Sequence, residues 1–315
     1  MNKKYNFSPD QFLLLLVSEG IDAELYGPST TIVNHLCNIE AADNNCITFY
    51  VGDDLSVVDD LRNCLLICKS GISVHKSVTQ IITANPKLAF YIISQSFSQP
   101  LPKKYFHNSV VIHPEAKIHP SAYIGPFCVI GKCQIGKDVF INSQVNLYDG
   151  VSIAERVIIE SGTSIGVTGQ IWAWDNNGKR WVMPQFGGVR IEEDCFIGSN
   201  ISIARGALQD TIIKKSARIA HGTMIGHNCI IGEETFISNR VAIAGSTSVG
   251  NYCFLGAGSV LKSGLILGDD ITIGAGAVVT KNCMDNGSVL AGVPAKVIKK
   301  VKKGEALAGV PPMGG

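Results

Sequence analysis

The sequence predicts a mainly β protein built around a parallel β-helix, with a small α/β domain before it and a short extension after it. Three observations predict this fold: an aliphatic residue recurs at every sixth position, turn-forming residues lie between these positions, and the repeat is absent before residue 105. A period of six fits neither an α-helix nor a simple hairpin, so each hexad is expected to be a short strand plus a turn. Three hexads would close one triangular coil of about 18 residues, and the coils would stack at the roughly 4.8 Å spacing of paired strands.

The strongest run of the repeat starts at Ile213 and continues for twelve positions without a slip. A weaker run precedes it, with one step of five residues between Ile130 and Ile135. All of these aliphatic side chains are expected to point into the β-helix. The strong run is Ile213, Ile219, Ile225, Ile231, Ile237, Ile243, Val249, Leu255, Leu261, Leu267, Ile273 and Val279, and the weaker positions are Ile112, Ile118, Ile124, Ile130, Ile135, Ile141, Leu147, Ile153, Ile159, Ile165, Ile191, Ile197 and Ile203.

Two interruptions of the repeat are expected to form loops that serve the binding face. The insertion 167–188 carries all three tryptophans, Trp172, Trp174 and Trp181, which we expect to contact substrate; the alternative is that they only cap or pack. The second interruption is the short excursion 205–210. The predicted domains are therefore residues 1–104, residues 105–282 with the insertion 167–188, and a C-terminal extension of residues 283–315.

Before residue 105 the pattern is that of a mixed α/β domain. Residues 8–11, Ser-Pro-Asp-Gln, predict the start of a helix with good capping chemistry. Residues 47–51 and 65–69 are predicted strands. Asn85 and the proline after it are expected to start a helix that runs to about Phe97.

Composition argues against several classes of partner. The chain has 27 basic and 26 acidic side chains, so no charge excess favours nucleic acid or an anionic membrane. The apolar run at residues 12–17 is far too short to span a bilayer, and no signal-peptide layout is present, so the protein is expected to be cytoplasmic. Ten scattered cysteines without a C-x-x-C pair suggest buried small hydrophobes, among them Cys128, Cys195, Cys229 and Cys253.

Several ordered strings resemble the LpxD family of lipid A pathway N-acyltransferases, and the likeness covers most of the chain. The resemblance implies a left-handed β-helix, a nucleotide-contacting N-terminal domain and a homotrimer. The strings are Cys46-Ile-Thr-Phe49, Asn85-Pro-Lys-Leu-Ala-Phe90, Trp181-Val-Met-Pro-Gln-Phe-Gly187, Ala204-Arg-Gly-Ala-Leu-Gln-Asp-Thr-Ile-Ile213, Ile225-Gly-His-Asn228 and Ala244-Gly-Ser246.

The same resemblance assigns the catalytic histidine to His227. His221, six residues earlier in an Ile-Ala-His of its own, is the rival base, and a third alternative is a solvated turn residue without a role. Histidine suits a general base because its unperturbed pKa of about 6.5 lies near working pH. Gly245 follows His227 by 18 residues, so it should lie beside it on the next coil, and by resemblance its backbone N–H is the oxyanion donor.

The acyl donor is expected to be a phosphopantetheine thioester. Residues 291–296, Ala-Gly-Val-Pro-Ala-Lys, resemble the ending of acetyl-CoA-dependent hexapeptide enzymes, whereas LpxD enzymes use acyl carrier protein and end differently. The tail therefore favours acyl-CoA as co-substrate over acyl carrier protein. The residues expected to bind the donor are Gly245, Ala257, Gly292, Ala295 and Lys296; no tightly bound cofactor and no metal is expected.

Departures from the family pattern favour a different acceptor. A second functional histidine of the family maps to Gly264, and of three uridine-contacting positions only Phe49 is kept, the others being Gly52 and Leu55. The predicted function is therefore N-acylation of a nucleotide-linked amino sugar for surface polysaccharide such as O-antigen, with a histidine base. The alternative is UDP-3-O-acylglucosamine N-acyltransferase of lipid A biosynthesis, using acyl carrier protein.

Two other classes stay open at this stage. A trimeric metal hydratase of the same fold would need three histidines converging on zinc, whereas the late repeat holds only His221 and His227. A non-catalytic hexapeptide scaffold would use neither histidine.

Overall fold

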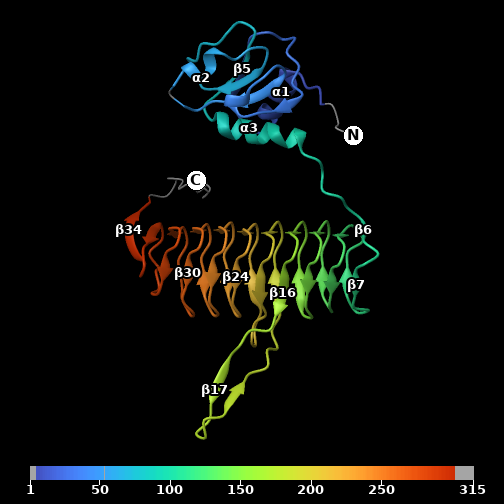
Figure 1. Cartoon of the computed structure of the whole chain (residues 1–315), viewed down its shortest axis with the longest axis vertical. Coiled ribbons are helices and arrows are strands. Elements are labelled where there is room, and N and C mark those ends of the chain that lie inside the picture. Colours follow the sequence, from blue (N-terminus) through green and yellow to red (C-terminus); the bar gives the residue numbers. More distant parts are fainter. Residues whose placement is uncertain (1–4, 53, 302–315) are drawn as a thin grey trace. The chain divides into compact units, whose positions relative to one another are not determined.

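The computed structural model describes residues 5–52 and 54–301, and its contacts divide the chain into two compact units, Met1–Pro100 and Leu101–Gly315 (Figure 1). The first unit holds a small mixed sheet with helices, and the second holds a long parallel β-helix. The predicted fold class is confirmed. Of the predicted C-terminal extension, residues 302–315 lie outside the described part of the chain.

The first unit is a five-stranded sheet in the order β1-β5-β4-β3-β2, in which only β1 runs antiparallel to its neighbour. One apolar cluster joins helices α1 and α3 to one side of the sheet, and a second cluster contains Cys46, Cys64 and Cys68. The elements are α1 (Pro9–Ser18), β1 (Ala23–Tyr26), β2 (His35–Leu36), η1 (Ile39–Ala41), β3 (Cys46–Phe49), α2 (Ser56–Asp59), β4 (Leu65–Cys68), β5 (Thr79–Thr83), α3 (Pro86–Ser94) and η2 (Gln95–Phe97).

Helix starts were the most predictable local features of this unit. Helix α1 begins after Ser8, whose backbone N–H donates to Gln11 Oε1 at 2.9 Å. Helix α3 begins after Asn85, whose side-chain oxygen accepts from the Leu88 N–H at 3.2 Å. Strands β3 and β4 confirm two predicted strands within one or two residues at each end.

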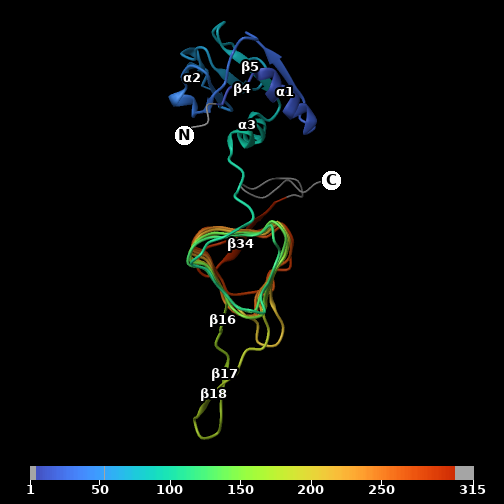
Figure 2. The same ribbon diagram turned by 90° about the vertical axis from the view of Figure 1, so that its right-hand side faces the viewer.

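The β-helix consists of three parallel sheets, one for each side of the triangular coil that Figure 2 shows end-on. The first sheet holds β7 (Val111–Ile112), β10 (Val129–Ile130), β13 (Asn146–Leu147), β16 (Ser164–Val167), β21 (Ser202–Ala204), β24 (Met224–Ile225), β27 (Ala242–Ile243), β30 (Val260–Leu261) and β32 (Val278–Val279). The second holds β8 (Lys117–Ile118), β11 (Gln134–Ile135), β14 (Val151–Ile153), β19 (Val189–Ile191), β22 (Thr211–Ile213), β25 (Ile230–Ile231) and β28 (Ser248–Val249).

The third sheet ends in an antiparallel hairpin that closes the β-helix. It holds β6 (Tyr105–Phe106), β9 (Tyr123–Ile124), β12 (Phe140–Ile141), β15 (Ile158–Ile159), β20 (Phe196–Ile197), β23 (Arg218–Ile219), β26 (Phe236–Ile237), β29 (Phe254–Leu255), β31 (Thr272–Ile273), β33 (Ser288–Ala291) and β34 (Lys296–Lys300). Strand β33 continues the parallel stack on β31, and β34 turns back along β33.

The aliphatic positions of the repeat form one continuous core. All twelve residues of the strong run are at most 2% exposed, and they belong to a single buried cluster. Ile112 is 37% exposed because its strand, β7, is the N-terminal end strand of the first sheet and no earlier coil covers it. The inward direction predicted from the six-residue period is confirmed.

The ten cysteines are free thiols, and those of the repeat pack as small apolar residues. Cys128, Cys195, Cys229 and Cys253 are at most 1% exposed. Burial raises the pKa of the Cys229 thiol to about 11, so it stays neutral and unreactive at neutral pH. No helix among the described residues is long and apolar enough to cross a membrane.

Neighbouring isoleucines on β25 test how much one inward position stabilises the coil. Ile231 is fully buried, whereas Ile230 points outward and is 36% exposed. Ile231→Ala is expected to lower the free energy of unfolding by about 2–5 kcal/mol, because the coil above and below holds the cavity open. Ile230→Ala, the matched control, should cost under about 1 kcal/mol in urea unfolding. Equal losses in the two variants would contradict the inward assignment.

Candidate functional site

The insertion 167–188 leaves the β-helix after β16 and forms an antiparallel hairpin of β17 (Trp172–Trp174) and β18 (Arg180–Val182). Figure 1 shows this hairpin projecting from the side of the β-helix. Its three indoles are 50–63% exposed. Trp181 Nε1 donates to Asp175 Oδ2 at 3.0 Å, and Lys179 Nζ lies 3.9 Å from the Trp181 ring centroid. Within one chain the tryptophans therefore contact their own hairpin, and their substrate role stays a prediction.

One corner of the β-helix brings together the residues singled out by the sequence. Strand register pairs Ile203 with Ile225 and Ile225 with Ile243 on successive coils. The residue two positions after Ile225 and after Ile243 follows the same stacking, which places His227 and Gly245 in one row. We call this row the His227 corner.

His227 and Gly245 are in direct contact at this corner. A Cβ atom built on Gly245 would lie 2.5 Å from His227 Nε2 and 2.6 Å from Cε1, so the imidazole occupies the space that a side chain at position 245 would fill. The backbone reinforces the stacking, because the Ser246 N–H donates to the His227 carbonyl at 2.7 Å. Any residue larger than glycine at position 245 must move the ring.

Asn228 fixes the orientation of the imidazole. Its Oδ1 accepts from the Ala207 N–H at 3.1 Å, and its Nδ2 donates to the Gln209 carbonyl at 3.4 Å, so two backbone groups set which end of the amide is the oxygen. This oxygen lies 3.0 Å from His227 Nδ1. Because the oxygen can only accept, Nδ1 is the ring nitrogen that donates to it, which leaves Nε2 as the nitrogen free to accept a proton. The group that orients the ring is thus an amide, and no orienting group was predicted from the sequence.

The two interruptions of the repeat meet at this corner. The excursion 205–210 supplies the Ala207 and Gln209 backbone groups that hold Asn228. The base of the insertion lies against the ring's own residue, because a Cβ on Gly169 would be 3.1 Å from His227 Cβ. Gln185 Oε1 accepts from the Gly169 N–H at 2.8 Å and closes that base. The base of the insertion, rather than its tryptophan-bearing tip, therefore adjoins His227.

The backbone N–H of Gly245 is available as a hydrogen-bond donor. It makes no hydrogen bond within the described residues, whereas its neighbours Ala244 and Ser246 both donate to backbone carbonyls. Gly226 keeps the approach to this group open, because a Cβ there would lie 2.5 Å from the Gly245 nitrogen. A free N–H beside an imidazole lone pair is the pair of groups that acyl transfer requires.

His221, the rival base, has a different environment. It lies on another corner, since it is one hexad before His227, and its side chain is exposed. Its Nδ1 accepts from the Ser199 N–H at 2.9 Å, so one ring nitrogen serves the turn of the preceding coil. Among the described residues, no glycine lies against its ring as Gly245 lies against that of His227. The geometry favours His227.

A cavity of about 310 Å³ lies on the same side of the β-helix, toward its N-terminal end. Its walls include Tyr148, Asp149, Thr168 and Arg205. Arg205 lies in the coil before that of His227, and its Nε donates to the Gly187 carbonyl at 2.7 Å. The cavity offers both a cation and a carboxylate, but neither His227 nor Gly245 lines it.

The other predicted residues lie in three places. Phe49 ends β3 in the first unit, and its ring packs at 4.8 Å from that of Phe90. Ala257 is exposed and follows His221 by two coils of 18 residues, so it lies outside the His227 corner. Gly292 and Ala295 both bond to Val278 of β32, at the end of the first sheet. The Val278 N–H donates to the Gly292 carbonyl at 3.1 Å, and the Ala295 N–H donates to the Val278 carbonyl at 2.8 Å.

Lys296 begins β34 and pairs with Ala291 across the closing hairpin. This hairpin contacts β32, the last strand of the first sheet. His227 follows β24 of the same sheet, and β27 and β30 lie between β24 and β32. Three strand spacings of about 4.8 Å separate the two strands, so the hairpin lies roughly 14 Å or more along the axis from the corner. Donor binding by these residues stays a prediction.

Comparisons with known proteins find relatives of one kind. A protein-family model described as the hexapeptide repeat of succinyl-transferase matches residues 188–207 and 246–281. UDP-3-O-acylglucosamine N-acyltransferase from Polynucleobacter asymbioticus is 31% identical over 244 residues, which cover 66% of this chain and 68% of that protein. The enzyme of the same name from Pseudomonas putida is 28% identical, covering 67% and 66%; the one from Bordetella pertussis is 35% identical, but over only 45% and 40%.

Solved structures with a similar fold include acyltransferases. LpxA from Acinetobacter baumannii superposes with a TM-score of 0.56 at 23% identity, covering 62% of this chain and 73% of that one. UDP-N-acetylglucosamine acyltransferase from Francisella novicida gives 0.53 at 26% identity, covering 60% and 67%. The first of these similarities supports the fold alone.

Proposed function

Because the chain belongs to the UDP-3-O-acylglucosamine N-acyltransferase family, we propose that it joins an acyl group to the amine of a UDP-linked 3-O-acylglucosamine. The protein is an acyltransferase of the hexapeptide-repeat class. The observation that carries the proposal is the His227 corner, where the imidazole lies against Gly245 and its free N–H.

The residues of this corner account for each step of amide formation. The acceptor amine attacks the thioester carbonyl while His227 Nε2 takes the proton that the nitrogen must lose. The carbonyl oxygen becomes an oxyanion, to which the Gly245 N–H donates a hydrogen bond. Collapse of the tetrahedral intermediate breaks the carbon–sulfur bond, and the imidazolium returns the proton to the leaving thiolate. Asn228 acts as a positioning residue, because it holds the Nδ1 proton and leaves Nε2 unprotonated.

The relatives favour the alternative interpretation of the sequence over the main one. Their name specifies UDP-3-O-acylglucosamine as acceptor, whereas nothing among them supports an O-antigen sugar. We therefore propose the lipid A pathway acceptor, with an acyl carrier protein as donor. The cytoplasmic location and the homotrimer stay predictions; sedimentation at micromolar concentration tests the second.

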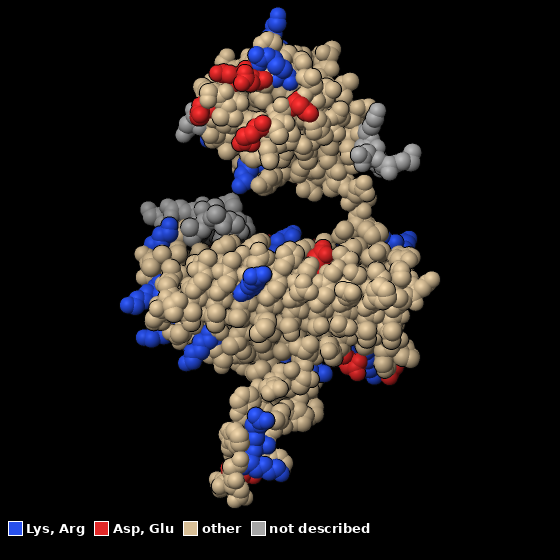
Figure 3. Space-filling view, viewed as in Figure 1, with Lys and Arg blue, Asp and Glu red and all other residues tan. Residues whose placement is uncertain are grey.

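The C-terminal hairpin supports a second candidate donor, acyl-CoA. Residues 291–296 rest on β32 at the end of the sheet that also leads to His227. Strand β34 is exposed throughout and carries Lys296, Lys299 and Lys300, and Figure 3 shows basic side chains gathered at this end of the β-helix. Such a basic end would attract the phosphates of coenzyme A or the acidic surface of a carrier protein.

A thiol-release assay distinguishes the donors and acceptors. We expect thiol release with UDP-3-O-acylglucosamine and an acyl-acyl carrier protein, and none when the acceptor is omitted. The parallel reactions use acyl-CoA as donor and other UDP-linked amino sugars as acceptors, with His227→Ala as the blank. Turnover of another amino sugar but not of UDP-3-O-acylglucosamine would overturn the proposed acceptor. Turnover with acyl-CoA but not with acyl-acyl carrier protein would overturn the proposed donor and favour acyl-CoA.

A further inference from the structure

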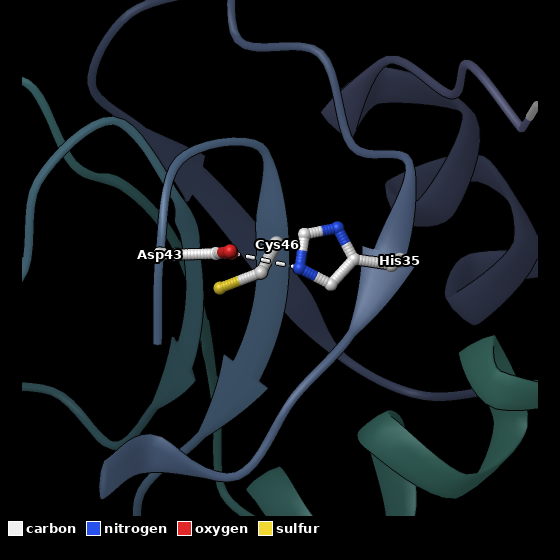
Figure 4. A group of neighbouring side chains, drawn as sticks. All are labelled: His35, Asp43 and Cys46. Carbon is white, nitrogen blue, oxygen red and sulfur yellow. Dashed lines mark hydrogen bonds and ion pairs between the residues drawn. The ribbon is translucent and has the colours of Figure 1, made fainter. Parts of the chain in front are cut away.

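The first unit contains a cluster of potential metal ligands that acyl transfer does not use. His35 lies on the edge strand β2, directly opposite Cys46 on β3, and Asp43 lies on the loop that joins these strands. Figure 4 shows the three side chains converging on one space. A nitrogen, an oxygen and a sulfur from the three residues all lie within 4.8 Å of one another. His35 Nε2 is 2.7 Å from Asp43 Oδ1.

The His35 ring is held in the orientation of a metal ligand. Its Nδ1 lies 2.5 Å from Asn34 Oδ1, an acceptor, so Nδ1 is the protonated nitrogen. Nε2 is then the ring nitrogen available to coordinate an ion, and it lies 2.7 Å from the Asp43 carboxylate. An imidazole fixed through its other nitrogen by an outer partner is the usual arrangement of a histidine that binds zinc.

The third donor, Cys46, lies among other thiols. Its side chain is fully buried. Ile47 pairs with Leu65, so Cys64, the residue just before β4, lies next to Cys46. Cys37 directly follows β2, and its Sγ lies 3.6 Å from the Ile47 carbonyl. The Cys46 side chain lies at the wall of the space that His35 and Asp43 enclose.

We propose that His35 Nε2, Asp43 and the Cys46 thiolate bind a zinc ion in the N-terminal unit. This mixed nitrogen, oxygen and sulfur set suits zinc better than magnesium or calcium, which prefer oxygen alone. Zinc–ligand bonds of about 2.0–2.3 Å place donors of a tetrahedral site roughly 3.3–3.8 Å apart. The exposed side chains of His35 and Asp43, 42% and 66% accessible, have room to open to that spacing. A water or a neighbouring thiol completes the fourth position.

The ion would link the edge strand β2 to its inner neighbour β3. Strand β2 has only two residues, and the loop after it returns to β3 through Asp43. Strand β3 ends at Phe49, the residue predicted to contact the nucleotide, so the ion would brace the strand that carries it. No metal was expected from the sequence. The three ligands follow no metal-binding spacing, and the pairing of β2 with β3 brings them together.

Metal titration of the full-length protein tests the site. The protein is purified without a histidine tag, reduced and stripped with a chelator, and zinc is then added in competition with a chromophoric chelator. We expect one zinc per chain. His35→Gln and Asp43→Asn should each weaken binding by at least about tenfold, since loss of an outer partner alone costs about 10–100-fold. Both side chains are exposed, so these variants should fold, which circular dichroism checks.

Cobalt substitution tests whether Cys46 is the sulfur ligand, and two control variants test whether the ion binds at this cluster. Cobalt-loaded protein should show a thiolate-to-cobalt charge-transfer band in the near ultraviolet that is lost in Cys46→Ser. His75→Gln and Cys68→Ser change the same residue types in the same unit outside the cluster, and they should bind zinc as the unaltered protein does. Zinc binding well below one per chain, or equal weakening in the controls, would overturn the site. Neither readout depends on acyl transfer, so the proposed function stands or fails separately.

Discussion

Replacing His227 by alanine is expected to lower kcat by about 10²- to 10⁴-fold, the usual contribution of a general base. The acceptor amine must lose a proton as it attacks, and among the described side chains the imidazole is the base in contact with Gly245. KM should change far less, because the ring is proposed to act on the reacting nitrogen rather than to bind the sugar or the nucleotide. Initial rates of thiol release with both substrates varied measure the two constants separately.

The fold should tolerate this change, since the side chain is half-buried at a corner and lies outside the apolar core. Circular dichroism and the urea midpoint check that it does. Added imidazole provides a further control, because a small base that restores part of the rate shows that the lost group carried a proton. A variant that keeps more than about a tenth of the rate is incompatible with the base role.

Gly245→Ala is expected to lower kcat by at least about 10²-fold without unfolding the protein. The added Cβ would lie 2.5 Å from His227 Nε2, so the ring must rotate away from the reacting atoms. Gly245 does not have a positive φ, so the backbone accepts alanine and the clash with the ring is the main cost. Single-turnover rates of acyl transfer, with donor and acceptor saturating, measure the loss at the chemical step.

The effect of Gly245→Ala should depend on His227. In the His227→Ala background the new methyl group meets no ring, so the second substitution should cost much less than it does alone, which is the non-additivity expected of contacting residues. Gly274→Ala is the matched control, because the nearest atom to its Cβ would be the Ala291 methyl group at 3.3 Å and its φ is not positive. Equal losses of activity in Gly274→Ala and Gly245→Ala would show that the loss comes from a disturbed β-helix rather than from displacement of the His227 ring.

The contact between His227 and Gly245 was predictable because it follows from the repeat. Each coil adds the same three hexads, so residues 18 apart in the strong run stack directly, as Ile225 and Ile243 do. The same period predicted which aliphatic side chains form the core. Ile135, which follows the five-residue step, also points inward, because it pairs with Ile118 and Ile153 in the second sheet.

The groups that complete the site lie where the repeat stops. Asn228 is fixed by backbone atoms of Ala207 and Gln209, which belong to an excursion without periodic register. Gly169, which Gln185 holds by a hydrogen bond, meets His227 because the insertion leaves and re-enters the β-helix at adjacent points. The tryptophans were the more prominent sequence signal, yet they occupy the exposed hairpin. Nothing in the spacing of these residues reveals such non-periodic contacts.

In the first unit, local signals predicted elements but not their pairing. Capping residues marked the starts of α1 and α3, whereas β1 and β5 were missed, although Gly27 and Pro28 follow β1 and Asn85 and Pro86 follow β5. The cluster of His35, Asp43 and Cys46 depends on β2 pairing with β3, a two-residue register that no local pattern predicts.

The most direct test of the proposed site compares kcat/KM for acyl transfer in His227→Ala and His221→Ala under one set of conditions. The two histidines are six residues apart on adjacent corners, and only His227 contacts Gly245. We predict that His227→Ala loses at least about 10²-fold while His221→Ala, which removes only the acceptor of the Ser199 N–H, keeps its activity within about threefold. A large loss in His221→Ala with activity retained in His227→Ala would contradict the assignment of the base and of the corner built around it.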